Sequence, residues 1–171
     1  MQPRSPNLTT WHITWGTYGA RLHGSNRRTV DRRAVAIGDS YVERNEQREQ
    51  AAKTIMRGNA VYLTDEQRRF IESTAVQLCD RGGWMLRTCA AAVEGDHIHV
   101  LLDADPAVHG EKIRRLLKRW LTQALDERFD RPESGTWWAV QGSNRVVDSD
   151  AYLNRVFPYI ERQRSTPSSP V

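Results

Sequence analysis

The sequence predicts a single α+β domain in which helices pack against a mostly antiparallel sheet. The chain has 171 residues, which suits one compact core and is short for two. Strand-like and helix-like segments follow one another without an internal repeat. Two of the strand-like segments are joined by a three-residue turn, and strands connected so closely must run antiparallel.

The first element is the alternating stretch TTWHITWGTYG, residues 9–19, which predicts a strand ending at Gly16 or Gly19. A polar region with little periodicity follows, from about 21 to 60. This is more loop than a compact domain usually carries, so we expect either a functional segment or an ordered insertion. The ends, 1–8 and 164–171, are rich in Pro and Ser and are expected to be loose.

Residues 64–83 predict a helix. Thr64, with Gln67 three residues later, forms a capping-box pattern at its start, and Gly82 and Gly83 end it. Its apolar residues recur at helical spacing and should face the core: Phe70, Ile71, Ala75 and Leu78. Residues 84–93 then predict a strand, 94–96 a tight turn and 97–104 a second strand, which together make a β-hairpin.

A second helix is predicted over residues 111–129, again from apolar spacing. Residues 137–147 indicate another strand, with an internal turn at the sequence GSN. Asp148 or Ser149 should cap a last helix. Pro158 lies within that helix, so we expect either a bend just before Tyr159 or a new helix starting there. The resulting order is typical of a ferredoxin-like α+β domain.

Composition narrows the class of protein. Apolar residues make up 39% and charged residues 27%, as in ordinary globular proteins, and no apolar run could cross a bilayer. The N-terminus has no apolar signal-peptide core, so we expect a cytoplasmic protein without membrane contact. A net charge of +4 permits a polyanionic partner without requiring one. Cys79 and Cys89 do not form a CxxC pair and suggest two buried reduced thiols.

The stretch GDHIHVLL contains the most distinctive chemical pattern. Residues two apart in a strand share a face, so His97 and His99 should project together while Ile98 and Val100 enter a core. Two neutral imidazoles on one strand face can share a divalent cation, with a third ligand from elsewhere. The alternative is a pair of half-buried histidines satisfied by backbone or water. A cupin site would need a Glu shortly after His99, and the sequence has none there. A two-histidine phosphodiesterase would need a second His-x-Thr motif in addition to the one at His12, and the sequence has no convincing second motif.

Tyr159 and Gln163 are four residues apart and should lie on one face of the last helix. A phenolic oxygen can act as a nucleophile, and an amide oxygen can bind a hard cation. A core tyrosine and a solvated glutamine are the alternative interpretation of these two residues.

Taken together, these residues resemble the single-tyrosine HUH transposases of small insertion sequences and the related REP-associated tyrosine transposases. HIHVLL is similar to the family's His-x-His strand, and Tyr159 with Gln163 to its Tyr-x-x-x-Gln helix. TWGTYGARLHG and WWAVQGSNRVV are similar to its opening strand and its tryptophan strand, so the resemblance covers nearly the whole chain. The long 21–60 segment and Pro158 depart from the shortest members.

The resemblance implies an HUH nuclease fold and a transposase that cleaves and rejoins single-stranded DNA near hairpins. It implies that His97, His99 and Gln163 bind Mg²⁺ or Mn²⁺, and that the metal polarises the scissile phosphate. It implies that Tyr159 is the nucleophile and forms a covalent 5′-phosphotyrosine link. Asp96 could orient a ligand, although its position in the turn favours a turn role. A homodimer is also implied.

Several basic residues could contact the DNA backbone, although for a run of charges a solvated face is the usual role. Four lie on the predicted 111–129 helix and two in the long polar region: Lys112, Arg115, Lys118, Arg119, Arg27 and Arg28. Trp11, Trp15, Trp137 and Trp138 could stack on unpaired bases, although in strands at most one or two should do so.

Three functions therefore compete. The first is an active strand-transfer enzyme, which we favour. The second is a domesticated protein that binds hairpin DNA without transposing it. The third is an unrelated metal-dependent hydrolase, which would take its third ligand from Asp or Glu and not from Gln163.

Overall fold

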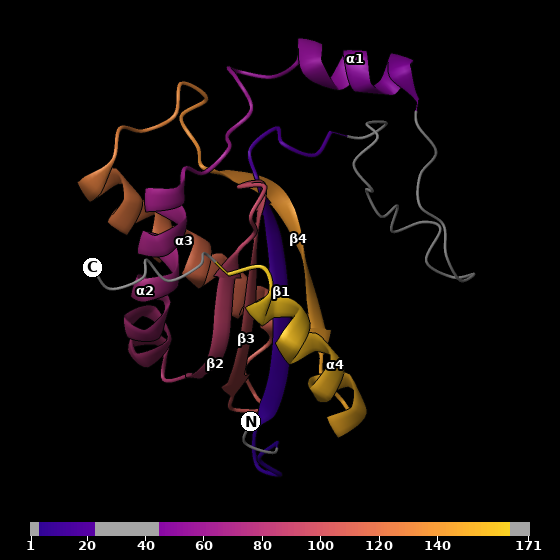
Figure 1. The fold of residues 1–171 in the computed structure, drawn as a ribbon, viewed down its shortest axis with the longest axis vertical. Helices are drawn as coiled ribbons and strands as arrows, with labels where there is room; N and C mark the ends of the chain where they lie inside the picture. Colours follow the sequence, from indigo (N-terminus) through magenta and orange to yellow (C-terminus); the bar gives the residue numbers. More distant parts are fainter. Residues whose placement is uncertain (1–3, 23–44, 165–171) are drawn as a thin grey trace.

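The computed structural model describes residues 4–22 and 45–164, which form a four-stranded sheet with helices on both faces (Figure 1). The strands are β1 (Thr9–Thr17), β2 (Met85–Ala91), β3 (His97–Ala104) and β4 (Trp138–Val146), and the helices are α1 (Glu46–Thr54), α2 (Asp65–Gly82), α3 (Gly110–Arg128) and α4 (Asp150–Glu161). The strand order is β2-β3-β1-β4, and each neighbouring pair is antiparallel. This arrangement confirms the predicted ferredoxin-like α+β fold.

The alternation of β3 divides the core in two. Ile98, Val100 and Leu102 face α2 and α3 and belong to the larger core. Leu101 faces the opposite side and packs with Leu153, Val156 and Ile160 of α4. Figure 1 shows α4 crossing the front of the sheet. The face of β3 that carries its two histidines is therefore covered by a helix and excluded from bulk solvent.

Local signals set the helix ends much as expected. The Thr64 side chain accepts from the Gln67 N–H, and the Gln67 side chain accepts from the Thr64 N–H, so the capping box is present. Gly83 ends α2 in the left-handed region, with φ of 69°. At α4 the cap is Ser149, whose hydroxyl accepts from the Tyr152 N–H.

The turn between β2 and β3 is held by neighbouring segments. Gly95 has φ of 70°, a conformation that other residues rarely adopt. Its carbonyl accepts from the Leu63 N–H at 2.9 Å, and the Asp96 carbonyl accepts from the Thr17 N–H at 2.9 Å. These bonds fix the start of β3, where the histidine pair begins.

The turn predicted inside 137–147 is wrong, because β4 continues through Gly142, Ser143 and Asn144 and pairs with β1. Gly142 is needed because the neighbouring strand packs closely against it, and not because the chain turns there. A Cβ at position 142 would lie 2.4 Å from the Thr14 carbonyl oxygen, closer than any side chain could come.

The region from 21 to 60 contains α1, which was not predicted and which buries none of its side chains. Its exposure explains why the sequence showed no helical periodicity there. Residues 23–44, including Arg27 and Arg28, lie outside the described residues. Pro158 lies inside α4, and not at the start of a new helix. In the part of the chain described, no helix has both the length and the apolar character to cross a membrane.

Candidate active site

The sheet face beneath α4 brings three histidines together. His97 and His99 project from β3, and His12 projects from the adjacent strand β1. The rings of His97 and His99 lie edge to face with centroids 4.7 Å apart, and those of His12 and His99 are stacked at 5.4 Å. The prediction that His97 and His99 share one face is therefore confirmed.

His97 is oriented by the residue before it. Its Nδ1 contacts Oδ1 of Asp96, whose other oxygen accepts from Nε of Arg21 at 3.1 Å. Burial alone would raise the pKa of Asp96, but hydrogen bonds from His97 and Arg21 hold it well below its usual range. Nη2 of Arg21 lies 3.0 Å from the same Nδ1, so this side of the ring is occupied by Asp96 and Arg21, and Nε2 is the nitrogen that remains for another partner. Asp96 thus contacts a predicted ligand in addition to forming the turn.

His99 is buried, and its Nδ1 contacts a histidine on the neighbouring strand. Its Nδ1 lies 3.1 Å from Nε2 of His12, and Nδ1 of His12 lies 3.3 Å from the hydroxyl of Tyr152. Burial, with the nearby charge of His97, lowers the pKa of His99 to about 3. Burial, with Arg145, lowers that of His12 to about 4. Both rings are consequently neutral near pH 7, the form in which imidazole binds metals.

The remaining nitrogen of His99 gives a test of the metal prediction. Nε2 is buried and has no hydrogen-bond partner among the described residues, an unfavourable state for a polar atom unless a ligand uses it. Both strand histidines thus have Nδ1 engaged, as metal-binding histidines commonly do. The donor set therefore fits a divalent cation. Within residues 4–22 and 45–164, no three His, Cys, Asp or Glu residues are grouped to hold a metal, so a third protein ligand would be of another type.

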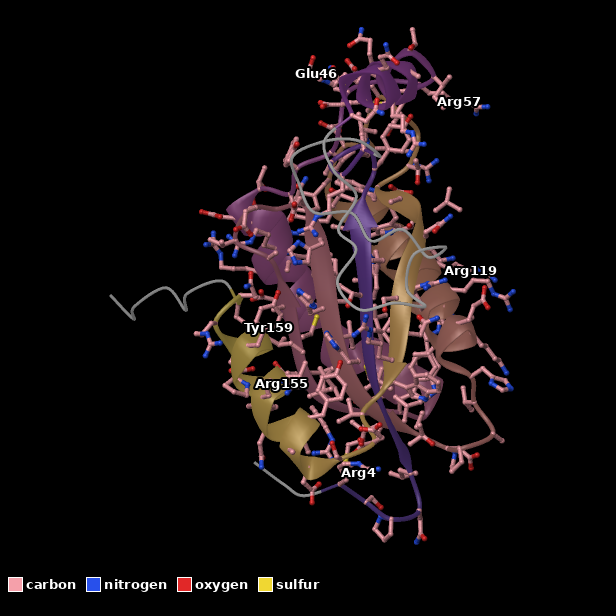
Figure 2. All side chains as sticks on the ribbon, turned by 90° about the vertical axis from the view of Figure 1, so that its right-hand side faces the viewer. Arg4, Glu46, Arg57, Arg119, Arg155 and Tyr159 are labelled. Atoms are coloured by element: carbon pink, nitrogen blue, oxygen red, sulfur yellow. The ribbon has the colours of Figure 1, made fainter. Side chains whose placement is uncertain are left out.

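Tyr159 lies against this pair. Its ring meets that of His99 edge to face, with centroids 5.4 Å apart and an interplanar angle of 84°. The residue is 41% exposed, so its phenol is accessible to an incoming molecule. Figure 2 shows it on α4, on the side of the sheet away from Arg119. The structure thus brings together Tyr159 and the two histidines that the sequence singled out.

Gln163 lies just after α4, in the turn where its backbone N–H donates to the Ile160 carbonyl at 2.9 Å. The prediction that Tyr159 and Gln163 lie on one face of the last helix is therefore wrong, because α4 ends at Glu161 and Gln163 belongs to the turn that follows. It is half-buried. In the part of the chain that the structure describes, no hydrogen bond joins its side chain to either strand histidine.

The predicted DNA-contacting residues of α3 are not brought to the histidines. Lys112, Arg115 and Arg119 are exposed on α3, which packs on the opposite face of the sheet. Lys118 differs from them, because its ammonium donates to the carbonyls of Ala139 at 2.5 Å and Val140 at 3.2 Å. Burial, with the nearby charge of Arg114, lowers the pKa of Lys118 to about 8.

Three of the four tryptophans considered for base stacking belong to the core. Trp15, Trp137 and Trp138 are 1–5% exposed, and Trp15 meets Trp138 edge to face at 6.0 Å. Only Trp11 is partly exposed, and it packs against the core as well. The stacking role is therefore wrong for the three buried rings, which are core residues.

Sequence reasoning missed His12, Arg21 and Tyr152 as members of the site. A weak signal existed for two of them. His12 is flanked at two-residue spacing by Thr10 and Thr14, which marks a polar strand face. Tyr152 precedes Tyr159 by seven residues, or two helical turns, and so lies on the same flank of α4.

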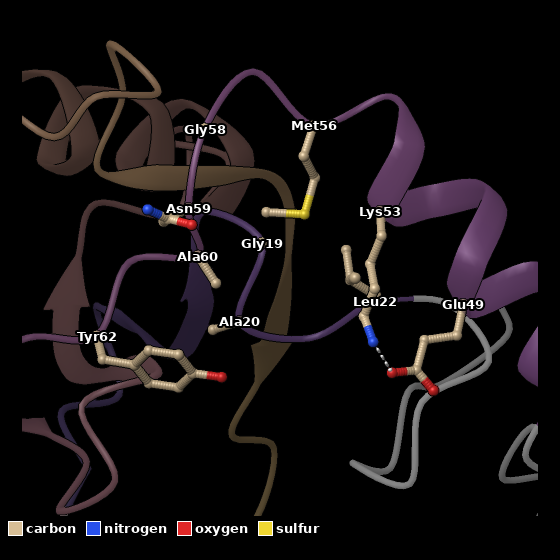
Figure 3. Close-up of a pocket in the computed structure, with 10 residues that line it drawn as sticks. All are labelled: Gly19, Ala20, Leu22, Glu49, Lys53, Met56, Gly58, Asn59, Ala60 and Tyr62. Carbon is tan, nitrogen blue, oxygen red and sulfur yellow. Dashed lines mark ion pairs between the residues drawn. The ribbon is translucent and has the colours of Figure 1, made fainter.

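A separate open pocket of about 660 Å³ lies between the segment after β1 and the stretch from α1 to Tyr62 (Figure 3). Its lining is mixed, because it includes Met56 and Tyr62 as well as an ion pair between Lys53 and Glu49 at 2.8 Å. His12, His97 and His99 do not line it.

Comparisons with known proteins give little guidance. No family model matches the chain, and no curated protein matches it. Among solved structures, the chain is similar to a candidate transposase from Deinococcus radiodurans R1, with 16% sequence identity and a TM-score of 0.43. The match covers 97% of this chain and all of the other. At that level of identity and superposition, the likeness assigns no function to this chain.

Proposed function

We propose that this protein is a metal-dependent transposase that cleaves and rejoins hairpin-associated single-stranded DNA, with Tyr159 as its nucleophile. The observation that carries the proposal is the contact of Tyr159 with His99, whose buried Nε2 has no partner among the described residues. The pattern of His97, His99, Tyr159 and Gln163, which resembles that of the HUH transposases, supports it further.

In the proposed reaction, the Tyr159 oxygen attacks a DNA phosphorus as its phenolic proton passes to solvent. The bond from phosphorus to the 3′ oxygen breaks, that oxygen takes up a proton, and a 5′-phosphotyrosine link remains. Attack by a 3′-hydroxyl then reverses these changes and frees Tyr159. One phosphodiester replaces another, so the exchange needs no external energy source.

His97, His99 and Gln163 would hold Mg²⁺ or Mn²⁺, which would supply Lewis-acid polarisation of the phosphate. Asp96 holds His97 in place, and the covering helix α4 keeps bulk water from His99. Because Tyr159 contacts His99 of its own chain, the proposed site can assemble within one protomer. The proposed partners are hairpin DNA and a second copy of the chain.

The test uses the full chain with Mn²⁺ and hairpin-forming single-stranded DNA from the flanks of its own gene. A 3′-labelled strand should yield a covalent protein–DNA band on a denaturing gel, and a 5′-labelled strand should yield only a shorter free fragment. Tyr159→Phe should abolish the band. Tyr62→Phe, which alters a tyrosine that is 48% exposed at the separate pocket, should retain it.

A band that survives in Tyr159→Phe would show that Tyr159 is not the nucleophile. Tight hairpin binding without any band would favour the domesticated binding protein.

A further inference from the structure

A chain of three polar side chains connects α4 to the sheet: Tyr152 of α4, His12 of β1 and His99 of β3. The Tyr152 hydroxyl lies 3.3 Å from Nδ1 of His12, and Nε2 of His12 lies 3.1 Å from Nδ1 of His99. Two imidazole nitrogens at 3.1 Å must share a single proton, because one has to donate and the other accept. The direction of that bond sets the tautomer of both rings.

If His12 donated, the proton of His99 would sit on Nε2. That N–H would be buried without an acceptor among the described residues, which is rare in proteins and unfavourable. If His99 donates instead, its Nε2 carries a lone pair that a cation can use. His12 then donates from Nδ1 to the Tyr152 oxygen, and the half-buried phenol is still able to donate its own proton outward.

At His97 the Nδ1 side is likewise occupied, by the Asp96 carboxylate and by Nη2 of Arg21 at 3.0 Å. In both strand histidines Nε2 is therefore the nitrogen on the side away from these contacts, and in His99 it is buried without a partner among the described residues. A structural filler at position 12 would not need this polarity, since the paired residue on β3 is the buried Leu101.

We propose that His12 and Tyr152 are positioning residues that hold His99 as its Nδ1–H tautomer, with the Nε2 lone pair free for a divalent cation. The claim that a cation binds at Nε2 rests on the proposed function, whereas the claim about the tautomer of His99 does not. Tyr152 lies two turns before Tyr159 on α4, so the helix that carries the proposed nucleophile also carries the last member of the chain.

The first test is nuclear magnetic resonance of the full ¹⁵N-labelled, metal-free protein, using two-bond nitrogen–proton correlations in the imidazoles. Single substitutions at His12 and His99 assign the signals. We expect both rings to be protonated on Nδ1 and bare on Nε2. A proton on Nε2 of His99 would overturn the proposal.

The second test measures Mn²⁺ affinity without DNA, by electron paramagnetic resonance of free Mn²⁺. His12→Gln keeps an oxygen that can accept from His99 and should bind Mn²⁺ within a few-fold of the natural protein. His12→Phe fills the space but cannot accept, and should bind about 10- to 100-fold more weakly. Equal affinity for the two variants would overturn the positioning role. If His12→Phe does not fold, Tyr152→Phe replaces it, with a smaller expected loss.

The two proposals fail separately. An Nδ1–H tautomer of His99 in a protein that forms no covalent DNA link would support this inference and contradict the proposed reaction. A covalent link together with an Nε2–H tautomer would do the reverse. A natural protein that binds no Mn²⁺ would overturn the cation while leaving the tautomer result intact.

Discussion

The ring of Tyr159 rests edge-on against the ring of His99, with the two centroids 5.4 Å apart. One residue belongs to α4 and the other to β3, so the contact depends on how that helix docks on the sheet. Docking rests on a small apolar cluster of Ala90, Leu101, Val147, Leu153, Val156 and Ile160. The chemistry proposed for Tyr159 therefore depends on that cluster.

Val156→Ala should test this dependence. Val156 is 4% exposed beneath α4, so losing two methyl groups should lower the free energy of unfolding by about 1.5–3 kcal/mol. Val76→Ala in α2 is the matched control, because that valine is 51% exposed and should change stability by less than about 0.5 kcal/mol. Urea denaturation of both variants measures the difference. Equal effects would mean that α4 is not held by its buried face.

The turn before the histidine pair gives a second prediction. Gly95→Ala would place a Cβ 2.5 Å from the Leu63 carbonyl oxygen, in addition to the strain of a positive φ. Gly83→Ala has nearly the same φ, but its Cβ would meet no atom within 4 Å, so only the backbone strain of about 1–2 kcal/mol applies. Thermal unfolding should show a clearly larger loss for Gly95→Ala. A loss no greater than that of the control would contradict the close packing described for this turn.

Elements with strong local signals could be predicted from the sequence. The capping box at Thr64, the β-hairpin that turns at Gly95 and the shared face of His97 and His99 all follow from residues near one another in the chain. α1 could not be predicted, because a helix that buries nothing has no apolar stripe to detect.

The partners of the histidines were harder to foresee. His12 and His99 are 87 residues apart, and the bond between them exists only because β1 and β3 pair. Gly142 was misread for the same reason, since the contact that requires it comes from Thr14 on β1. Packing between distant segments determined both features, and no local pattern records such packing.

The two thiols give a prediction about pH. Burial, with the charge of Asp80, raises the pKa of Cys79 to about 12, and burial, with Glu72, raises that of Cys89 further. Neither forms thiolate near pH 8, so a disulfide reagent should label neither in the folded chain and both in urea. Above about pH 9, the unfolded chain loses thiol protons that the fold retains, so stability should fall as pH rises. Rapid labelling of the native protein at pH 8 would contradict this burial.

The α3 surface allows the DNA expectation to be tested residue by residue. Arg119 is exposed and free to reach a phosphate, whereas the Lys118 ammonium already donates to two carbonyls of β4. Arg119→Gln should weaken single-stranded DNA binding and lower the slope of log affinity against log salt by about 0.7. Lys118→Gln should leave that slope unchanged while lowering the free energy of unfolding, because the carbonyls of Ala139 and Val140 lose their charged donor. Fluorescence anisotropy at several salt concentrations distinguishes the two. If neither variant alters the slope, DNA does not contact this face of α3, and its charges are a solvated helix surface.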